Sequence, residues 1–282
     1  MKKKIIAIIV AIQLIIMAGE MWYNFLTEYF FDAEIASFAH LKYVEISDTE
    51  AKVVGHKSGL ESKLTVPINV MIGLHIYKVT RIGNYAFYGC SRLTSIKIPE
   101  GVTSIGYKAF LGCSSLTSIN IPEDVTSIEG CAFMNCSSLA NIDIPEGVTS
   151  IEEFAFSWCS SLISIEIPEG VTSIGEGAFG GCSNLTSIEI PEGVTSIGAS
   201  AFSGCSRLTS INIPNSVTSI GEEAFWGCSR LTSIEIPEGV TSIGVGAFKG
   251  CKKLNVLIDN SKEKVEIGKD AFKGCKSVRF LK

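Results

Sequence analysis

The sequence predicts a β-rich solenoid of nine stacked coils, and three periodic features carry this prediction. Phenylalanine recurs every 23 residues, cysteine follows it three residues later, and proline has one fixed place in seven of the copies. A constant period of about 20 to 50 residues is the signature of a repeat architecture. Because 23 residues are too few for a pair of helices or a propeller blade, the period favours a solenoid.

The period is strict over eight copies and gains one residue in the last. Its phenylalanines are Phe87, Phe110, Phe133, Phe156, Phe179, Phe202, Phe225, Phe248 and Phe272, and its cysteines are Cys90, Cys113, Cys136, Cys159, Cys182, Cys205, Cys228, Cys251 and Cys275. One coil alone buries too little apolar surface to offset the entropy of ordering its backbone. Each copy therefore needs its neighbours, which explains the repetition.

Within one coil, residues 185–190 match the strand signature L-x-x-L-x-L of leucine-rich repeats. Pro191 ends this strand because proline has no backbone N–H for a sheet ladder. Residues 194–198 alternate apolar and polar and predict a second short strand. Ala201 and Phe202 then fill the interior from a turn of 3₁₀ or irregular backbone.

The first copy is interrupted, and a cap is expected before it. Residues 64–67 and 78–83 read as two halves of a first repeat, separated by an insertion at 68–78. Residues 43–55 alternate and turn like a β-hairpin. An amphipathic helix is expected at 21–42, either as a cap on the first coil or as a membrane-surface segment. The domains are thus 20–63 for helix and hairpin cap and 64–282 for the solenoid.

Both ends of the array depart from the repeat. Residues 254–259 lack the proline and are expected to lose the strand register, so the repeats from 249 onward are atypical. At the start of the chain, Lys2, Lys3 and Lys4 precede an apolar run at 5–18. This layout is typical of a secretory signal peptide. Residues 1–19 are therefore interpreted as a signal peptide or, if uncleaved, as an N-terminal anchor.

Charge is segregated along the chain although the net charge is only −5. Residues 81–248 carry six basic and seventeen acidic side chains, whereas 249–282 carry ten basic and four acidic ones. Nucleic acid is not expected as the main partner, because binding phosphates needs a basic stripe along the contact surface.

The repeated unit L-x-x-I-x-I-P-x-x-V-x-x-I-x-x-x-A-F-x-x-C resembles the BspA-like family of leucine-rich repeats over residues 64–280. The resemblance implies a β-rich solenoid, placed by the family in the α/β class. It also implies a surface or secreted protein that adheres to host matrix or to other cells. A protein ligand is the partner implied, with membrane contact only through an uncleaved N-terminal segment.

Ten cysteines in an exported chain raise the question of disulfides. The ladder cysteines of neighbouring coils all point the same way, which favours free, buried thiols over pairing. Cys131 lies off the ladder and is interpreted as a tolerated substitution, with an exposed or intermolecular thiol as the alternative. No C-x-x-C occurs, so no metal site and no cofactor is predicted.

An enzyme is not expected. The histidines His40, His56 and His75 lie outside the regular copies, and no motif selects a Cys–His pair. The G-x-S-x-G elbow, the P-loop and H-E-x-x-H are all missing. A secreted enzyme using Cys131 or a histidine remains only as an alternative.

The candidate site is a column of carboxylates on a face expected to be concave. One outward strand residue per coil gives the series Lys97, Asn120, Asp143, Glu166, Glu189, Asn212 and Glu235. A second series follows the prolines: Glu100, Glu123, Glu146, Glu169, Glu192, Asn215 and Glu238. These columns either keep the stack soluble and separate or bind a basic protein segment or a weakly held Ca²⁺ ion.

The predicted partner-binding residues are Asp143, Glu166, Glu189, Asn212 and Glu235. The expected function is a non-enzymatic adhesion or protein-binding module at the surface or secreted. A rival is a cell-envelope scaffold that binds anionic polymers through a basic C-terminal patch, formed by Lys262, Lys264, Lys269, Lys273, Lys276 and Arg279 with Lys282.

Overall fold

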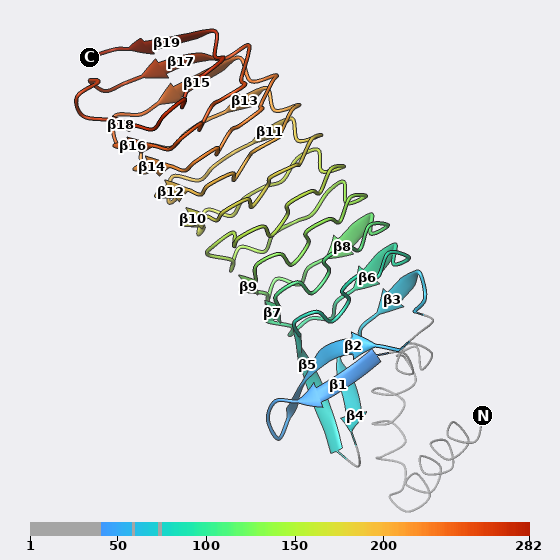
Figure 1. Ribbon diagram of the computed structural model, residues 1–282. Helices are drawn as coiled ribbons and strands as arrows, with labels where there is room; N and C mark the ends of the chain where they lie inside the picture. Colours follow the sequence, from blue (N-terminus) through green and yellow to red (C-terminus); the bar gives the residue numbers. More distant parts are fainter. Residues whose placement is uncertain (1–40, 58–59, 73–74) are drawn as a thin grey trace, which may run out of the picture.

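The computed structural model describes residues 41–57, 60–72 and 75–282 of the chain. Over these residues the chain winds into an elongated stack of coils that ends with the C-terminal strands (Figure 1). The described residues form strands and turns and no helix, so none of their segments is a helix that could cross a membrane. The predicted β-solenoid is confirmed.

A first row of strands precedes the prolines and pairs in parallel from coil to coil. Ser187 pairs with Ser210 and Ile188 with Ile211, so equivalent residues of adjacent copies are direct neighbours. The row consists of β3 (Lys63–Thr65), β6 (Ser95–Lys97), β8 (Ser118–Asn120), β11 (Ser187–Ile188), β13 (Ser210–Ile211), β15 (Ser233–Ile236), β17 (Asn255–Ile258) and β19 (Ser277–Phe280). These strands form three separate sheets, β3-β6-β8, β11-β13 and β15-β17-β19.

A second row of strands follows the prolines and is also parallel within the solenoid. It consists of β5 (His75–Ile82), β7 (Ser104–Ile105), β9 (Ser127–Ile128), β10 (Ser173–Ile174), β12 (Ser196–Ile197), β14 (Ser219–Ile220), β16 (Ser242–Ile243) and β18 (Glu266–Ile267). Between β9 and β10 the row continues as a single bridge from Ile151 to Ile174. The second short strand expected after each proline is thus present in most coils.

The turns that carry the phenylalanines form a third row of backbone hydrogen bonds. The N–H of Phe179 donates to the carbonyl of Ala201 in the next coil at 2.8 Å, and Phe202 donates to Ala224 at 2.7 Å. Because these bonds hold one ring above the next, the phenylalanines stack. Neighbouring ring centroids are 5.0–5.6 Å apart from Phe87 to Phe272, with interplanar angles of 1–11°.

The N-terminal end is covered by the predicted hairpin. Strands β1 (Leu41–Glu45) and β2 (Glu50–His56) pair antiparallel, and β2 pairs in parallel with β5, which joins the hairpin to the second row. Within the insertion, β4 (Asn69–Ile72) pairs antiparallel with the first half of β5. The signal segment and residues 21–40 of the expected helix lie outside the described residues. Residues 41 and 42 belong to β1 rather than to a helix.

The expected loss of strand register at 254–259 is wrong. Val256 pairs with Ile234 and Ile258 with Ile236, and both side chains are fully buried. Between Leu254 and the strand this coil has one residue fewer than the preceding coil has after Leu231. The inward side chains therefore begin one position earlier, at Val256. The longer connection that follows leaves Phe272 stacked on Phe248 at 5.6 Å.

One position in the turn adopts a left-handed backbone in every coil. Glycine fills it in most copies, because φ near +70° is unfavourable for a residue with a Cβ. Asn135 and Trp158 are the exceptions, each with a φ of +60°, and Trp158 is 57% exposed. In the next coil a Cβ on Gly181 would lie 2.7 Å from Trp158 Cδ2, so the indole lies directly against this glycine.

Alanine at Gly181 is therefore expected to destabilise the protein more than alanine at Gly204. Both glycines have φ above +70°, so each substitution costs about 1 kcal/mol from the backbone alone. A Cβ at Gly204 meets nothing closer than 3.8 Å, whereas the one at Gly181 meets the indole. Urea denaturation of both variants, and of Gly181→Ala in a Trp158→Gly background, measures the difference. Equal costs at the two positions would contradict the contact.

Candidate functional site

The strand column runs along the outward face of the first row. It consists of the residue between the two inward isoleucines of each coil: Lys97, Asn120, Asp143, Glu166, Glu189, Asn212 and Glu235. The side chains of residues 165–167 alternate as on a strand, although these residues form no strand ladder: Ile165 and Ile167 are buried and Glu166 is exposed. All seven members are exposed, and the five predicted partner-binding residues among them share one face.

The ladder of the first row is interrupted where the strand column becomes acidic. No first-row strand forms at 140–144 or 163–167, the segments that carry Asp143 and Glu166. Like charges on directly adjacent strands weaken pairing. These carboxylates lie in single file, and the described residues contain no group of three or more His, Cys, Asp or Glu side chains that could hold a metal ion. The Ca²⁺ alternative therefore gains no support from the geometry.

The proline column lies beside the strand column and is exposed in every coil. Its members are Glu100, Glu123, Glu146, Glu169, Glu192, Asn215 and Glu238. A notch of about 230 Å³ connects the two columns, with Asn212 and Glu235 from one and Glu192 and Asn215 from the other in its lining. Asp259 also lines this notch. The acidic surface is thus two residues wide and hollowed near its C-terminal end.

The basic C-terminal side chains come from several segments of the last coils. Lys262 and Lys264 lie in the connection after β17, Lys269 and Lys273 lie around the last turn, and Arg279 lies on β19. All are exposed, as is Lys276, and Lys273 contacts Asp270 at 3.3 Å.

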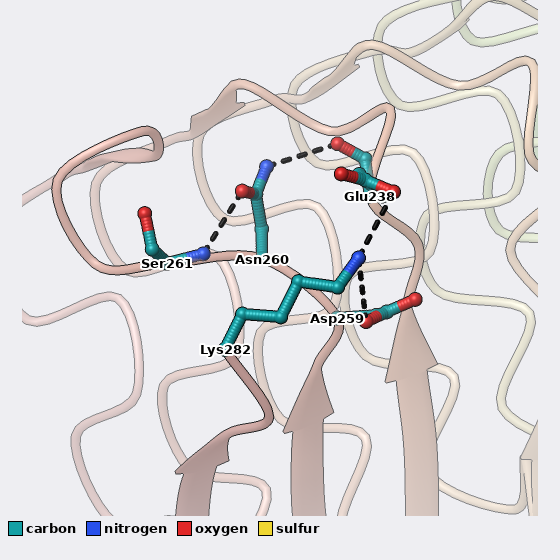
Figure 2. A network of polar contacts seen from close by, with 5 residues as sticks. All are labelled: Glu238, Asp259, Asn260, Ser261 and Lys282. Atoms are coloured by element: carbon teal, nitrogen blue, oxygen red, sulfur yellow. Dashed lines mark hydrogen bonds and ion pairs between the residues drawn. The ribbon is translucent and has the colours of Figure 1, made fainter.

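Lys282 folds back onto the acidic surface. Its Nζ lies 2.9 Å from Glu238 Oε2 and 3.2 Å from Asp259 Oδ1, as Figure 2 shows. Beside it, the Asn260 side chain donates to the carbonyl of Glu238 at 2.9 Å and accepts from the N–H of Ser261 at 2.9 Å. The acidic face therefore binds an ammonium group from this chain itself.

All ten cysteines are free thiols. From Cys113 to Cys275 each ladder S–H donates to the carbonyl of a phenylalanine in the preceding coil, as Cys205 does to Phe179 at 3.2 Å. Burial raises the pKa of the Cys182 thiol to about 12 and that of Cys205 well above its usual range. The prediction of free, buried thiols is confirmed along the ladder from Cys90 to Cys251, and Cys275 is partly buried.

The alternative interpretation of Cys131 as an exposed thiol is wrong. The residue is 6% exposed, and burial raises the pKa of its thiol. The longer side chains of Lys108 and Phe154 occupy the same position in the coils on either side, so the short cysteine side chain is shielded from solvent. The structure therefore does not support the reading of Cys131 as a nucleophile.

A Cys–His pair does occur at the cap, although no motif indicated it. His56 Nε2 lies 3.0 Å from Cys90 Sγ, and His56 Nδ1 lies 3.0 Å from the carbonyl of Lys57. The hydrogen bond between Cys90 and Cys113 and the burial of Cys90 raise the pKa of the Cys90 thiol, so this thiol stays neutral. Cys90 has no preceding ladder phenylalanine, so His56 takes the place of the missing carbonyl. His75 is exposed on β5, and His40 lies outside the described residues.

A parallel stack of 23-residue coils with inward leucine, isoleucine and phenylalanine defines the class of leucine-rich-repeat solenoids. The chain belongs to the BspA type leucine rich repeat family, whose model matches residues 74–168 and 149–279. The resemblance stated from the repeated unit is thereby confirmed. A search of curated proteins found no match.

Solved structures of bacterial repeat proteins are similar to this chain. The leucine-rich repeat protein of T. pallidum is 27% identical with a TM-score of 0.53, covering 79% of this chain and 90% of its own. A leucine-rich repeat protein from Bacteroides ovatus is 25% identical with a TM-score of 0.40, covering 84% and 91%. A leucine rich cell surface protein from Faecalibacterium prausnitzii is 26% identical with a TM-score of 0.38, covering 86% and 93%.

Proposed function

We propose that this protein is an exported, non-enzymatic binding module that attaches to protein partners through the acidic surface of its strand and proline columns. The basic, then apolar start of the chain supports export. The observation that carries the binding proposal is the exposure of Asp143, Glu166, Glu189 and Glu235 along one face of the stack.

The partner segment is basic and extended. A row of carboxylates spaced by about 4.8 Å, the separation of neighbouring strands, matches a chain that presents lysine or arginine side chains along its length. Attraction between such surfaces raises the rate of association and weakens as salt rises. The contact of Lys282 with Glu238 and Asp259 supports the proposal, because it is an ion pair of this kind within the chain itself.

Replacing Glu166 and Glu189 with glutamine is expected to weaken the binding of a labelled octalysine peptide about tenfold at low salt. Each exposed ion pair contributes up to about 1 kcal/mol, and a tenfold change corresponds to about 1.4 kcal/mol. Fluorescence anisotropy at several salt concentrations measures both the affinity and its salt dependence. The salt dependence should also become less steep, because fewer charges take part.

The matched control removes two carboxylates elsewhere. Glu176 and Glu222 are exposed in the turns after the second row, and their change to glutamine alters the net charge by the same amount. This variant should bind like the unmodified protein apart from a small general effect of net charge. If both double variants bind equally, the carboxylates of the strand column have no specific role and the proposal fails.

A further inference from the structure

A groove crosses the N-terminal end of the same face. It has a volume of about 540 Å³ and lies over β3, β6 and β8. In the lining, the outward side chains of these strands are Lys63, Thr65, Ser95, Lys97, Ser118 and Asn120. Glu61 is the only carboxylate in the lining, so the groove carries two positive charges against one negative charge.

The polar side chains of this groove have no partners among the described residues. No side-chain hydrogen bond or ion pair involves Lys63, Lys97 or Ser95 there. The neighbouring threonines differ, because Thr94 Oγ1 donates to the carbonyl of Ser62 at 2.8 Å and Thr117 Oγ1 to that of Thr94 at 3.1 Å. The threonines join the coils, whereas the donors of the groove remain available to a ligand.

The groove is continuous with the strand column, and the charge changes sign between them. Thr65 pairs with Lys97 and Lys97 with Asn120 in the register of the first row. The next member of the column is Asp143, two coils beyond Lys97, and Glu166 follows. One face of the rod thus presents ammonium and hydroxyl groups first and carboxylates afterwards.

We propose that the groove over β3, β6 and β8 is an anion subsite that binds the acidic residues of a partner segment whose basic residues lie on the strand column. This inference rests on the proposed function and specifies its partner as a polypeptide with an acidic and a basic block. Paired acidic side chains match two ammonium groups and several hydroxyl donors. A purely basic segment would leave Lys63 and Lys97 facing like charge.

The structure also sets the spacing of the two blocks. Asp143 and Glu166 lie two and three coils from Lys97, or about 10 and 14 Å at about 4.8 Å per strand. An extended peptide covers about 3.3 Å per residue. The basic residues should therefore begin about three or four positions from the acidic ones.

The test compares two labelled peptides, EEGSKKKK and QQGSKKKK, by fluorescence anisotropy at low salt. Attraction to net charge alone favours QQGSKKKK, which is more positive by two charges. The proposal reverses this order, and EEGSKKKK should bind about three- to tenfold tighter. Changing Lys63 and Lys97 to glutamine should remove this preference, so that QQGSKKKK binds tighter. Changing the exposed Lys252 and Lys253 to glutamine removes the same charge from the last coils and should leave the preference intact.

The outcomes separate this inference from the proposal on which it rests. If QQGSKKKK binds tighter to the unmodified protein and depends on Glu166 and Glu189, the acidic surface functions but the groove is not an anion subsite. Loss of the preference in both lysine variants would also overturn the subsite, because the effect would then be one of net charge. If neither peptide binds, both proposals are wrong. Circular dichroism of each variant checks that the coils remain folded.

Discussion

Replacing Phe179 with alanine should lower the free energy of unfolding by about 3 to 5 kcal/mol, the range for removing a large buried aromatic side chain. Phe179 is fully buried between Phe156, with centroids 5.6 Å apart, and Phe202, at 5.4 Å. The substitution leaves a cavity and removes a stacking partner from two rings at once. Urea denaturation, followed by circular dichroism, measures the loss.

The expected loss depends on where the phenylalanine lies in the stack, and Phe179 lies in the middle. Each coil of a solenoid contacts only its neighbours, so a defect in the middle weakens the coupling between two halves. Phe272 lies at the end of the described stack, is only partly buried and stacks on Phe248 alone. Alanine at Phe272 should therefore cost clearly less than alanine at Phe179. Equal losses would mean that stacking between coils contributes little to stability.

The periodic residues predicted the architecture because each of them has the same environment in every coil. A phenylalanine that recurs at 23 residues becomes a stack, and a cysteine that recurs with it becomes a ladder of thiols bound to phenylalanine carbonyls. The strand column followed from the same argument, since a two-residue strand period places Glu166 and Glu189 on one face. What repeats in the sequence has one local structure, and one copy predicts the others.

The features that the sequence did not predict lie where the repeat changes. The strand β17 was not predicted because its coil has one residue fewer before the strand than the other coils. The sequence alone therefore did not show that Val256 is equivalent to Ile234. The contact of His56 with Cys90 joins a cap residue to the first ladder thiol, and no fixed spacing relates the two. The groove at Lys63 and Lys97 arises in the same interrupted region. Contacts between a repeat and a unique segment require the fold itself.

Inward and outward residues have different roles, and this difference bears on partner specificity. Inward positions hold the same residue types in almost every coil, since any change there disturbs two interfaces. Outward positions change from Lys97 to Asp143 to Asn212 without affecting the core, because their side chains are exposed. Partner specificity in this protein is therefore expected in the order of charges along the strand column, and not in a single residue.

Raising the pH from 7.5 to 10.5 should destabilise the protein strongly through its buried thiols. Burial raises the pKa of Cys182 to about 12 and those of Cys159 and Cys205 well above the usual range. In the unfolded chain these thiols ionise near pH 8.5. Above that value the unfolded state loses protons that the folded state retains, so the free energy of unfolding falls with pH. The fall is about 1.4 kcal/mol per pH unit for each such thiol.

Urea denaturation under reducing conditions at pH 7.5, 8.5, 9.5 and 10.5 measures this dependence. Stability should be nearly constant up to about pH 8.5 and then decline, until the pKa of the folded thiols is reached. The variant with serine at Cys182 and Cys205 keeps a donor for the carbonyls of Phe156 and Phe179 but has no thiol to ionise at these positions. Its curve should fall less steeply by about 2.8 kcal/mol per pH unit, twice the value for one thiol. Other groups that titrate in this range are common to both proteins and cancel in the difference. Parallel curves for the two proteins would show that the ladder thiols do not remain protonated in the folded state.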